Sequence, residues 1–461
     1  MLVDIRPVKH DHPMMPRTLL LAVLFIGTTT ARAQDACLTG ASTLGDQRAI
    51  ATLRTDTETV CPCETAASLG KWRRCAKTLL GSAVAGNTLR AECEKTVKLL
   101  IKGASCGSAR VPCGRVQPTG TVPVSCRVKA QSGCHDRPKY DQTACDEQTH
   151  CADVVDWTAG TCSDVRDRGP FEAGVRTITM TKQSAVHPEQ QRVLNTVVWY
   201  PTTAGAGPID GSTQGVVNAP VDASGGPYPV LLFSHGSCGY PLQSTFLLPL
   251  IASRGYVVVA PPHPGNTLNE FPSCGTAQAL GEAAVERPQD VIFALDQMLA
   301  ANGDSGSDFF GVLDPSRIGM SGHSFGGFTT FLVVAQDSRF KVAVPMAPAT
   351  PGGNASFDVP SLMMLGNIDS VVNLNTARQA YTNSDAPKYK VEIEHAGHYA
   401  FSNLCFPSPD CNPPTTLTQD EAHGPVLRFV IPFLELYLKG DARFAAFFES
   451  PPPGVLFDAA P

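Results

Sequence analysis

Short apolar runs alternate with amphipathic stretches along the chain from about residue 171 onward. Such runs are expected for strands that are buried on both faces of a parallel sheet. The predicted strands are Val193–Tyr200, Val230–Ser234, Tyr256–Ala260, Arg317–Ser321, Val342–Met346, Ser361–Gly366 and Lys390–Glu394. Between them, Arg287–Ala300 and Phe328–Ala335 have apolar residues at helical spacing. The alternation predicts an α/β domain with a mostly parallel sheet covered by helices on both faces.

The first part of the chain begins with a helical pattern, after which Pro, Gly and Thr dominate up to Cys162 and suggest short loops or strands. Apolar residues at helical spacing predict one helix from about Ala66 to Leu80 and a second helix that follows Asn87, as its N-cap, and ends near Lys102. Twelve of the 16 cysteines lie in this part: Cys37, Cys61, Cys63, Cys75, Cys93, Cys106, Cys113, Cys126, Cys134, Cys145, Cys151 and Cys162. We expect the two helices to be joined through Cys63, Cys75, Cys93 and Cys106.

So many cysteines favour disulfides in an exported protein over a metal site. The run Cys61-Pro62-Cys63 superficially resembles a zinc motif, but paired Cys-x-x-Cys knuckles do not occur in the sequence. We expect no metal. The cysteine-rich segment resembles modules beside the catalytic domains of some exported bacterial proteins, and a binding module for a surface or polymer, a spacer and a stabiliser all remain open as its role.

The N-terminus has the pattern of a signal peptide. An apolar run, Thr18–Gly27, follows Arg17 and is followed by Ala31-Arg32-Ala33, the small-x-small pattern of a signal peptidase site. This run is too short to span a membrane, so we expect secretion without stable membrane insertion. The predicted division is a signal peptide over residues 1–33, a cysteine-rich domain over 34–165 and a catalytic domain over 166–461.

Charge changes at the second of these boundaries. Residues 34–165 contain 16 Lys and Arg against 14 Asp and Glu, whereas residues 166–461 contain 16 against 26. Such an acidic balance disfavours binding to nucleic acid, because binding to phosphates is driven by basic surfaces. We therefore expect no nucleic-acid partner.

The decisive motif is Gly322-His323-Ser324-Phe325-Gly326-Gly327, which joins a predicted strand to a predicted helix. Glycines on both sides of the serine are required where a strand turns so tightly into a helix that neighbouring backbones touch. This strand–turn–helix context predicts a nucleophile elbow, in which the hydroxyl of Ser324 stands clear of the sheet. The alternative is an ordinary glycine-rich turn.

A serine nucleophile needs a histidine base oriented by a carboxylate, in the chain order Ser, Asp, His for this kind of elbow. Asp369 follows the predicted strand Ser361–Gly366, and His398 follows the predicted strand Lys390–Glu394. We predict a triad of Ser324, Asp369 and His398. The rivals for the acid and the base are less well placed along their elements: Asp358, His395 and His423.

The oxyanion that forms during attack needs two backbone N–H donors. We expect these donors to be Phe325, directly after the nucleophile, and Ser237 in the glycine-containing loop after the strand Val230–Ser234, with Cys238 as the alternative to Ser237. The remaining cysteines form an even set, for which we predict two disulfides: Cys238–Cys274 and Cys405–Cys411.

Several segments together resemble a known family: His235-Gly236-Ser237, Ala260–Thr267, Glu286–Asp296, the elbow, and His395-Ala396-Gly397-His398. They are similar to bacterial α/β-hydrolases of the dienelactone-hydrolase-like type, and more distantly to platelet-activating-factor acetylhydrolases and cutinase-like polyester hydrolases. The resemblance covers nearly all of the second part of the chain and implies the α/β-hydrolase fold and esterase chemistry. True dienelactone hydrolases have a cysteine in place of Ser324, and the serine–acid spacing is nearer that of the cutinase-like polyester hydrolases.

We therefore expect a secreted serine hydrolase that cleaves carboxylic esters without a metal or organic cofactor. Only residues 347–360 separate two predicted strands where many hydrolases insert a cap of helices, and their prolines and glycines disfavour a helical lid. The cleft should be open to short-chain soluble esters and also to bulky or polymeric esters. The alternatives are an exopeptidase of the prolyl-oligopeptidase type and a catalytically inactive binding protein on a hydrolase scaffold.

Overall fold

The structure is a computed structural model. It describes residues 37, 43–62, 66–103, 110–116, 123–130, 134, 141–144, 168–405, 416–448 and 454–461. The predicted signal peptide and the predicted boundary between residues 165 and 166 lie outside these ranges. Within them, no helix combines the length and the apolar character needed to cross a membrane.

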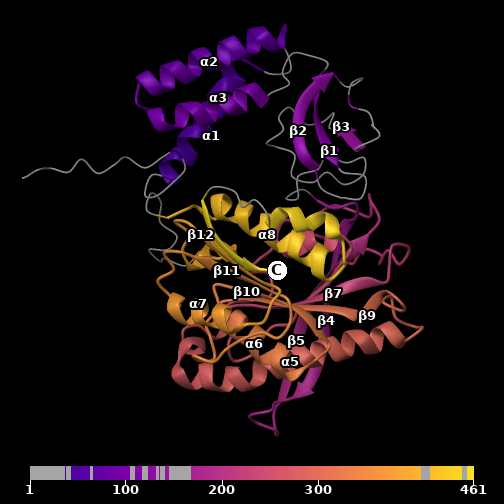
Figure 1. Ribbon diagram of the computed structural model, residues 1–461. Helices are drawn as coiled ribbons and strands as arrows, with labels where there is room; N and C mark the ends of the chain where they lie inside the picture. The colour runs from indigo at the N-terminus through magenta and orange to yellow at the C-terminus, as the bar shows by residue number, and fades with distance from the viewer. Residues whose placement is uncertain are drawn as a thin grey trace, which may run out of the picture. The chain divides into compact units, whose positions relative to one another are not determined.

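The part from residue 168 onward is built on one sheet of ten strands, in the order β13-β12-β11-β10-β9-β7-β8-β5-β4-β6 (Figure 1). The six strands from β7 to β12 are parallel to their neighbours among one another, and β4, β5 and β13 add antiparallel pairs. Their bounds are β4 Glu172–Gln183, β5 Gln191–Thr202, β6 Val216–Val217, β7 Tyr228–Ser234, β8 Val257–Ala260, β9 Leu313–His323, β10 Phe340–Met346, β11 Ser361–Gly366, β12 Lys388–Ile393 and β13 Val455–Ala460.

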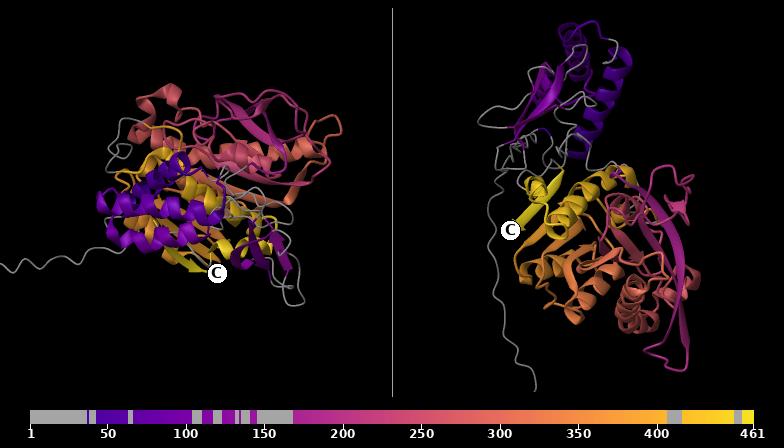
Figure 2. Two further views of the ribbon diagram at one scale, coloured as in Figure 1. Left: turned by 90° about the horizontal axis from the view of Figure 1, so that it is seen from above. Right: turned by 90° about the vertical axis from the view of Figure 1, so that its right-hand side faces the viewer.

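Helices cover both faces of this sheet. The helices α4 (Leu248–Ser253) and α8 (Gln419–Tyr437) pack on one face in a cluster that includes Phe233 and Phe429. On the other face, α5 (Ala277–Gly303), α6 (Phe325–Gln336) and α7 (Leu374–Asn383) pack in a second cluster (Figures 1 and 2). Because both faces are covered, every residue of β7 and of β11 is buried, which explains their uninterrupted apolar sequences. Short 3-10 helices complete this part: η4 Leu268–Glu270, η5 Ser273–Gly275, η6 His398–Phe401 and η8 Ala442–Phe448.

The cysteine-rich part has a hydrophobic cluster of its own, which includes Leu53, Trp72, Leu80 and Val97. Its described elements are α1 Thr43–Val60, α2 Leu69–Ala85, η2 Ala91–Cys93, α3 Glu94–Gly103, β1 Arg110–Val116, β2 Pro123–Ala130 and β3 Asp141–Ala144. The three strands form a separate antiparallel sheet in the order β2-β1-β3.

The disulfides of this part correct the expected connection. Cys75 is bonded to Cys61 and Cys93 is bonded to Cys37, whereas Cys63 and Cys106 lie outside the described residues. The different pairing of Cys75 involves the helix α1, which the apolar pattern did not reveal. This helix ends directly before Cys61, the partner of Cys75. The side chain of Trp72 donates a hydrogen bond from Nε1 to the carbonyl of Cys61 at 2.9 Å and fixes that end against α2. A further bond joins Cys113 to Cys134.

The predicted fold class is confirmed as a mostly parallel α/β sheet with a disulfide-rich segment before it, but some bounds were wrong. The helix α5 begins at Ala277 instead of Arg287, because Thr276 accepts a hydrogen bond from the N–H of Ala279 and caps the helix there. Asn87 is not an N-cap: it has a φ of 56° in the turn after α2. The strands β4 and β13 were missed because partly exposed strands lack a continuous apolar run.

Candidate active site

Ser324 lies at the sharp turn between β9 and α6. Its backbone has φ 58° and ψ −117°, outside the regions that most residues adopt, and its N–H donates to the carbonyl of Met346 at 2.9 Å. The lack of a side chain at two glycines makes this turn possible. A Cβ on Gly326 would lie 1.8 Å from the carbonyl oxygen of Ser234. A Cβ on Gly322 would lie 2.2 Å from the carbonyl oxygen of Gly326. The two glycines therefore keep the half-buried Ser324 at the carboxyl edge of the sheet.

Asp369 and His398 come together at the same edge. Asp369 follows β11 and His398 follows β12, and Nδ1 of His398 lies 2.8 Å from Oδ2 of Asp369. The other carboxylate oxygen accepts the N–H groups of Val371 and Val372 at 2.8 and 3.0 Å. Burial alone would raise the pKa of Asp369, but the hydrogen bond and charge of His398 and the two N–H donors outweigh it and hold this pKa below its ordinary value. The carboxylate thus stays ionised and accepts a hydrogen bond from Nδ1 of His398.

The rival residues are placed for other tasks. Asp358 is exposed and precedes β11, so it lies at the opposite end of that strand from Asp369. His395 has a φ of 60°, and its N–H donates to Oδ1 of Asn367 at 2.8 Å in the turn after β12. His423 stacks on the ring of Phe246, with ring centroids 3.6 Å apart.

The loop after β7 leaves one backbone donor available next to Ser324. The N–H of Gly236 donates to Oε1 of Gln243 at 3.0 Å, and the N–H of Cys238 donates to the carbonyl of Asn266 at 3.2 Å. Neither Ser237 N–H nor Phe325 N–H has a protein acceptor within the described part of the chain. A Cβ built on Gly236 would lie 3.4 Å from Cβ of Ser324, so this loop passes directly beside the serine. The arrangement favours Ser237 over Cys238 as the second donor.

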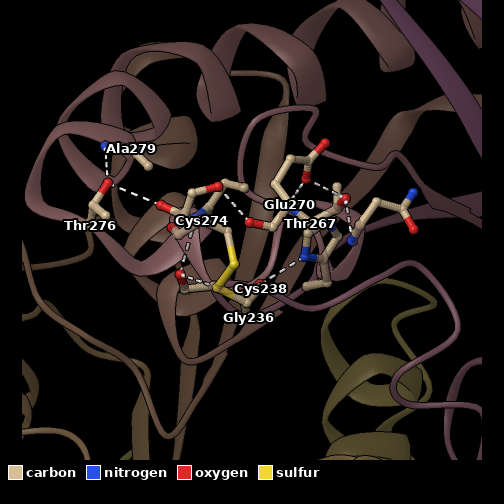
Figure 3. Close-up of a disulfide and its surroundings, with 12 residues drawn as sticks. Gly236, Cys238, Thr267, Glu270, Cys274, Thr276 and Ala279 are labelled. Atoms are coloured by element: carbon tan, nitrogen blue, oxygen red, sulfur yellow. Dashed lines mark hydrogen bonds between the residues drawn. A yellow bond between two sulfur atoms is a disulfide. The ribbon is translucent and has the colours of Figure 1, made fainter.

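The structure joins Cys238 to Cys274, the pair expected from the sequence (Figure 3). The bond ties the loop after β7 to η5. Next to it, the side chain of Asn266 donates from Nδ2 to the hydroxyl of Ser237 at 3.0 Å and to the carbonyl of Cys274 at 2.6 Å. Cys405 is also disulfide-bonded, and its expected partner, Cys411, lies outside the described residues.

A buried pair that sequence reasoning missed connects this loop to the histidine turn. Gln243 accepts the N–H of Gly236 and donates from Nε2 to Nδ1 of His323 at 3.0 Å. His323 then donates from Nε2 to the carbonyl of His398 at 2.9 Å. Burial, followed by the nearby charge of His398, lowers the pKa of His323 to about 3, so this ring is neutral and each nitrogen has one role. No local motif marks Gln243, because its partners come from distant segments.

Apolar side chains follow Ser324 and Asp369 closely in the chain, and the segment after β10 forms no helical lid. Phe325 and Phe328 stack with ring centroids 4.8 Å apart, and Ile368 and Val371 are exposed beside Asp369. Residues 347–360, between β10 and β11, contain no helix and are fully described. This segment therefore provides no cap over Ser324.

One cluster in the described ranges brings ligand-type atoms together: Cys37, Asp46 and Cys93. The two cysteines form a disulfide with each other. The carboxylate of Asp46 accepts hydrogen bonds from Nε and Nη2 of Arg90 at 2.7 and 2.8 Å. The potential metal ligands of this cluster are thus already bonded to other groups of the protein.

A comparison with protein families decides the family of the chain. Residues 199–458, more than half of the sequence, match the family model described as PETase, PET hydrolase-like. The chain belongs to this family. The matched residues include the elbow, Asp369, His398 and the loop after β7.

Individual relatives agree with this family. The chain is 25% identical over 297 residues to Lipase 1 of Moraxella sp. (strain TA144), covering 63% of this chain and 72% of that one. It is 27% identical over 177 residues to Cutinase est1 of Thermobifida alba, covering 38% of this chain and 54% of the cutinase. The match thus spans about half of the cutinase's length.

A solved structure has the same fold. The ferulic acid esterase from Streptomyces cinnamoneus superposes with a TM-score of 0.51 at 21% identity, covering 63% of this chain and 97% of that one. Together with the family match and the lipase and cutinase relatives, this likeness confirms the predicted α/β-hydrolase fold. These relatives indicate a carboxylic ester hydrolase, as the sequence predicted.

Proposed function

We propose that this protein is a secreted serine hydrolase that cleaves carboxylic esters through an acyl-Ser324 intermediate, with Asp369 and His398 as its acid and base. The observation that carries the proposal is the 2.8 Å contact between His398 and Asp369 at the edge of the sheet where the strained Ser324 turn lies. A histidine held by an ionised carboxylate is the partner that a serine hydroxyl needs to become a nucleophile.

The mechanism follows from these groups. Nε2 of His398 takes the hydroxyl proton of Ser324 while Oγ attacks the ester carbonyl carbon. The carbonyl oxygen becomes an oxyanion that accepts the N–H groups of Phe325 and Ser237. As the oxyanion collapses, the bond to the alcohol oxygen breaks and His398 returns the proton to the leaving alcohol. Water, activated by the same ring, then hydrolyses the acyl-serine and releases the acid.

The substrate range that we propose includes bulky and polymeric esters. The segment between β10 and β11 provides no helical cap, and Phe325, Ile368 and Val371 form apolar surface beside the site. Apolar surface next to an open serine suits acyl groups with hydrophobic or aromatic parts. The membership in the PET hydrolase-like family supports the same range.

Export is part of the proposal. Disulfides persist in oxidising compartments, and the described residues contain four complete bonds, Cys37–Cys93, Cys61–Cys75, Cys113–Cys134 and Cys238–Cys274. The predicted leader over residues 1–33 agrees with this location. We further propose that the cysteine-rich part binds a surface or polymer on which the ester substrate is found.

A fluorophosphonate probe tests the proposed chemistry. We expect stoichiometric labelling on the peptide that contains Ser324, with parallel loss of activity on an ester panel, because the probe reacts only with an activated serine. The matched control is Ser316→Ala, since Ser316 is exposed near the start of β9 and its hydroxyl donates to Asp314. An unlabelled protein would favour an inactive binder. A labelled protein that cleaves peptides but no ester would favour the exopeptidase.

The open cleft makes a kinetic prediction. We expect the rate on a short-chain p-nitrophenyl ester to rise smoothly with concentration through the aggregation threshold of the substrate, because no helix of residues 347–360 has to move. Initial rates measured across that threshold check this expectation. Rates that stay negligible below the threshold and rise sharply above it would contradict the open cleft and point to a lid supplied by residues 203–229 or by the cysteine-rich domain.

A further inference from the structure

Arg287 is a fully buried cation beneath the loop that contains Ser237. It lies within α5 and has no exposed surface. Its Nη1 donates to the carbonyl of His235 at 2.6 Å and reaches the hydroxyl of Ser234 at 3.3 Å, and its Nη2 donates to the carbonyl of Gly236 at 2.9 Å. One guanidinium thus holds two successive carbonyls of the candidate oxyanion loop.

This cation lacks the carboxylate that usually accompanies a buried arginine. The nearby Asp290 is bonded instead to Lys182, Arg192 and His263, and Arg287 forms no salt bridge within the described part of the chain. Its Nε also has no acceptor there. Burial lowers the pKa of Arg287 to about 9, with Asp290 opposing and Arg192 adding to this shift, so the group remains charged at neutral pH. A buried charge without direct neutralisation is costly, and its field acts on the surrounding groups.

The contact with Gly236 acts on the candidate oxyanion donor itself. The carbonyl of Gly236 and the N–H of Ser237 belong to one peptide group. Donors on the oxygen of a peptide draw electron density from its nitrogen and strengthen the N–H as a donor, since hydrogen bonds in a chain polarise one another. The charge of Arg287 supplies one such donor to Gly236, and His235 supplies another.

The tautomer of His235 follows from its two partners. Its Nε2 accepts the N–H of His263 at 3.2 Å, so Nδ1 carries the hydrogen and donates to the carbonyl of Gly236 at 2.7 Å. Burial, followed by the charge of Arg287, lowers the pKa of His235 well below its ordinary value, which keeps the ring neutral. The 3.4 Å approach of Arg287 Nη2 to Nδ1 then joins two atoms that both carry hydrogen and is not a hydrogen bond.

Arg287 also touches the other half of the site. Its guanidinium carbon lies 5.1 Å from the ring centroid of Phe325, whose N–H is the other candidate donor, at cation–π distance. A single side chain therefore contacts both segments whose N–H groups face the oxyanion. No other arginine of the described ranges has this pair of contacts.

We propose that Arg287 is a positioning residue of the oxyanion hole: it aligns the peptide of Ser237 against Phe325 and places a positive field behind the developing oxyanion. The proposal rests on the proposed function. It assigns a task in the reaction to a group that does not touch the substrate and that no local motif marks.

Ser234, His263 and Asp290 form a hydrogen-bonded chain that is arranged like a second catalytic triad and holds Arg287 in place. The hydroxyl of Ser234 lies 2.9 Å from Nε2 of His263, and Nδ1 of His263 lies 3.0 Å from Oδ2 of Asp290. All three residues are completely buried, unlike Ser324, so this hydrogen-bonded chain has no access to substrate. It fixes the Ser234 hydroxyl that Arg287 contacts and gives the cation one defined position.

The test compares Arg287→Met, which keeps an unbranched side chain up to the ε position but removes the guanidinium and its charge, with Arg287→Lys and with the control Arg254→Met. Arg254 is also buried, but it follows α4 at the end of β8 remote from Ser324. Active sites are titrated with the fluorophosphonate, so that kcat is expressed per competent site. Inhibition by a trifluoromethyl ketone, whose adduct with a serine bears an oxyanion, is measured beside KM.

We expect Arg287→Met to lower kcat per site by about 10- to 100-fold and to weaken the binding of the ketone inhibitor by the same factor. KM should stay within about threefold of the value of the unchanged protein. Arg287→Lys should recover part of both losses, because lysine keeps the charge but lacks the guanidinium that donates to both carbonyls. Arg254→Met should lower only the melting temperature. A purely structural role predicts fewer titratable sites with normal kcat, and that result for Arg287→Met would overturn the proposal.

Three further outcomes keep the test decisive and separate this proposal from the proposed function. If Arg287→Met does not fold, a per-site kcat and ketone affinity of Arg287→Lys within threefold of the unchanged protein would overturn the proposal. If the unchanged protein is neither labelled nor active on esters, the proposed function fails, and this inference fails with it. Labelling of the unchanged protein together with normal Arg287 variants would overturn this inference alone.

Discussion

Replacing His398 with alanine is expected to lower kcat on a soluble ester by roughly 10⁵- to 10⁶-fold, about as much as Ser324→Ala. The change removes the ring that we propose as the base for Ser324, while Asp369 keeps the N–H groups of Val371 and Val372 as partners. Because members of a triad act as a unit, the double variant should lose little more than either single variant. Pre-steady-state and steady-state kinetics on one p-nitrophenyl ester measure the effect.

His395→Asn is the matched control for this experiment. His395 lies three positions before His398 and has a φ of 60°, a conformation that asparagine tolerates better than most residues. Its contact with Asn367 uses the backbone N–H and is retained by the substitution. We expect kcat within about threefold of the unchanged protein. Activity in His398→Ala, or an equal loss in His395→Asn, would move the base away from His398.

Gly326→Ala is expected to prevent formation of the native elbow. The new methyl group would lie 1.8 Å from the carbonyl oxygen and 2.6 Å from the carbonyl carbon of Ser234, and 2.9 Å from the carbonyl oxygen of His235. All three are backbone atoms at the end of a central strand, so no side-chain rotation relieves the clash. We expect insoluble protein, or a soluble protein that the fluorophosphonate does not label. Soluble yield, thermal melting and labelling report the outcome.

Gly281→Ala provides the comparison. Gly281 lies in α5 with open space around its Cα, so alanine adds no contact and has the better helix propensity. We expect this variant to be as active as the unchanged protein and more stable by about 0.5–1 kcal/mol. If Gly326→Ala instead melts and labels like Gly281→Ala, the tight approach of the elbow to β7 is wrong.

The strands that could be predicted are those buried on both faces. In β7 and β11 the apolar run and the strand coincide closely, because every side chain packs against a helix layer. The strands β4 and β13 escaped prediction, since their partly exposed faces admit polar residues such as Thr181 and Asp458. The early start of α5 also escaped, because its cap at Thr276 precedes an alanine-rich turn with little apolar contrast.

The cysteines show the same division between local and distant information. An even number of cysteines after residue 166 left few ways to pair them, and the structure joins Cys238 to Cys274. In the first part, the partners of Cys75 and Cys93 depended on the path of α1, whose weak amphipathic pattern gave no warning. Disulfide partners follow from the folded path of the chain, and spacing alone does not contain that path.

The sequence by itself determined the α/β class and the candidate Ser324, Asp369 and His398, because each follows a buried strand and chain order is enough to bring strand ends to one edge. Only the tertiary structure decided how these groups are held. Gln243 and His323 are 80 positions apart, and Arg287 lies 52 positions from His235. Buried polar groups find their partners wherever the fold brings donors and acceptors together, so their roles depend on three-dimensional packing and leave no periodic signal in the chain.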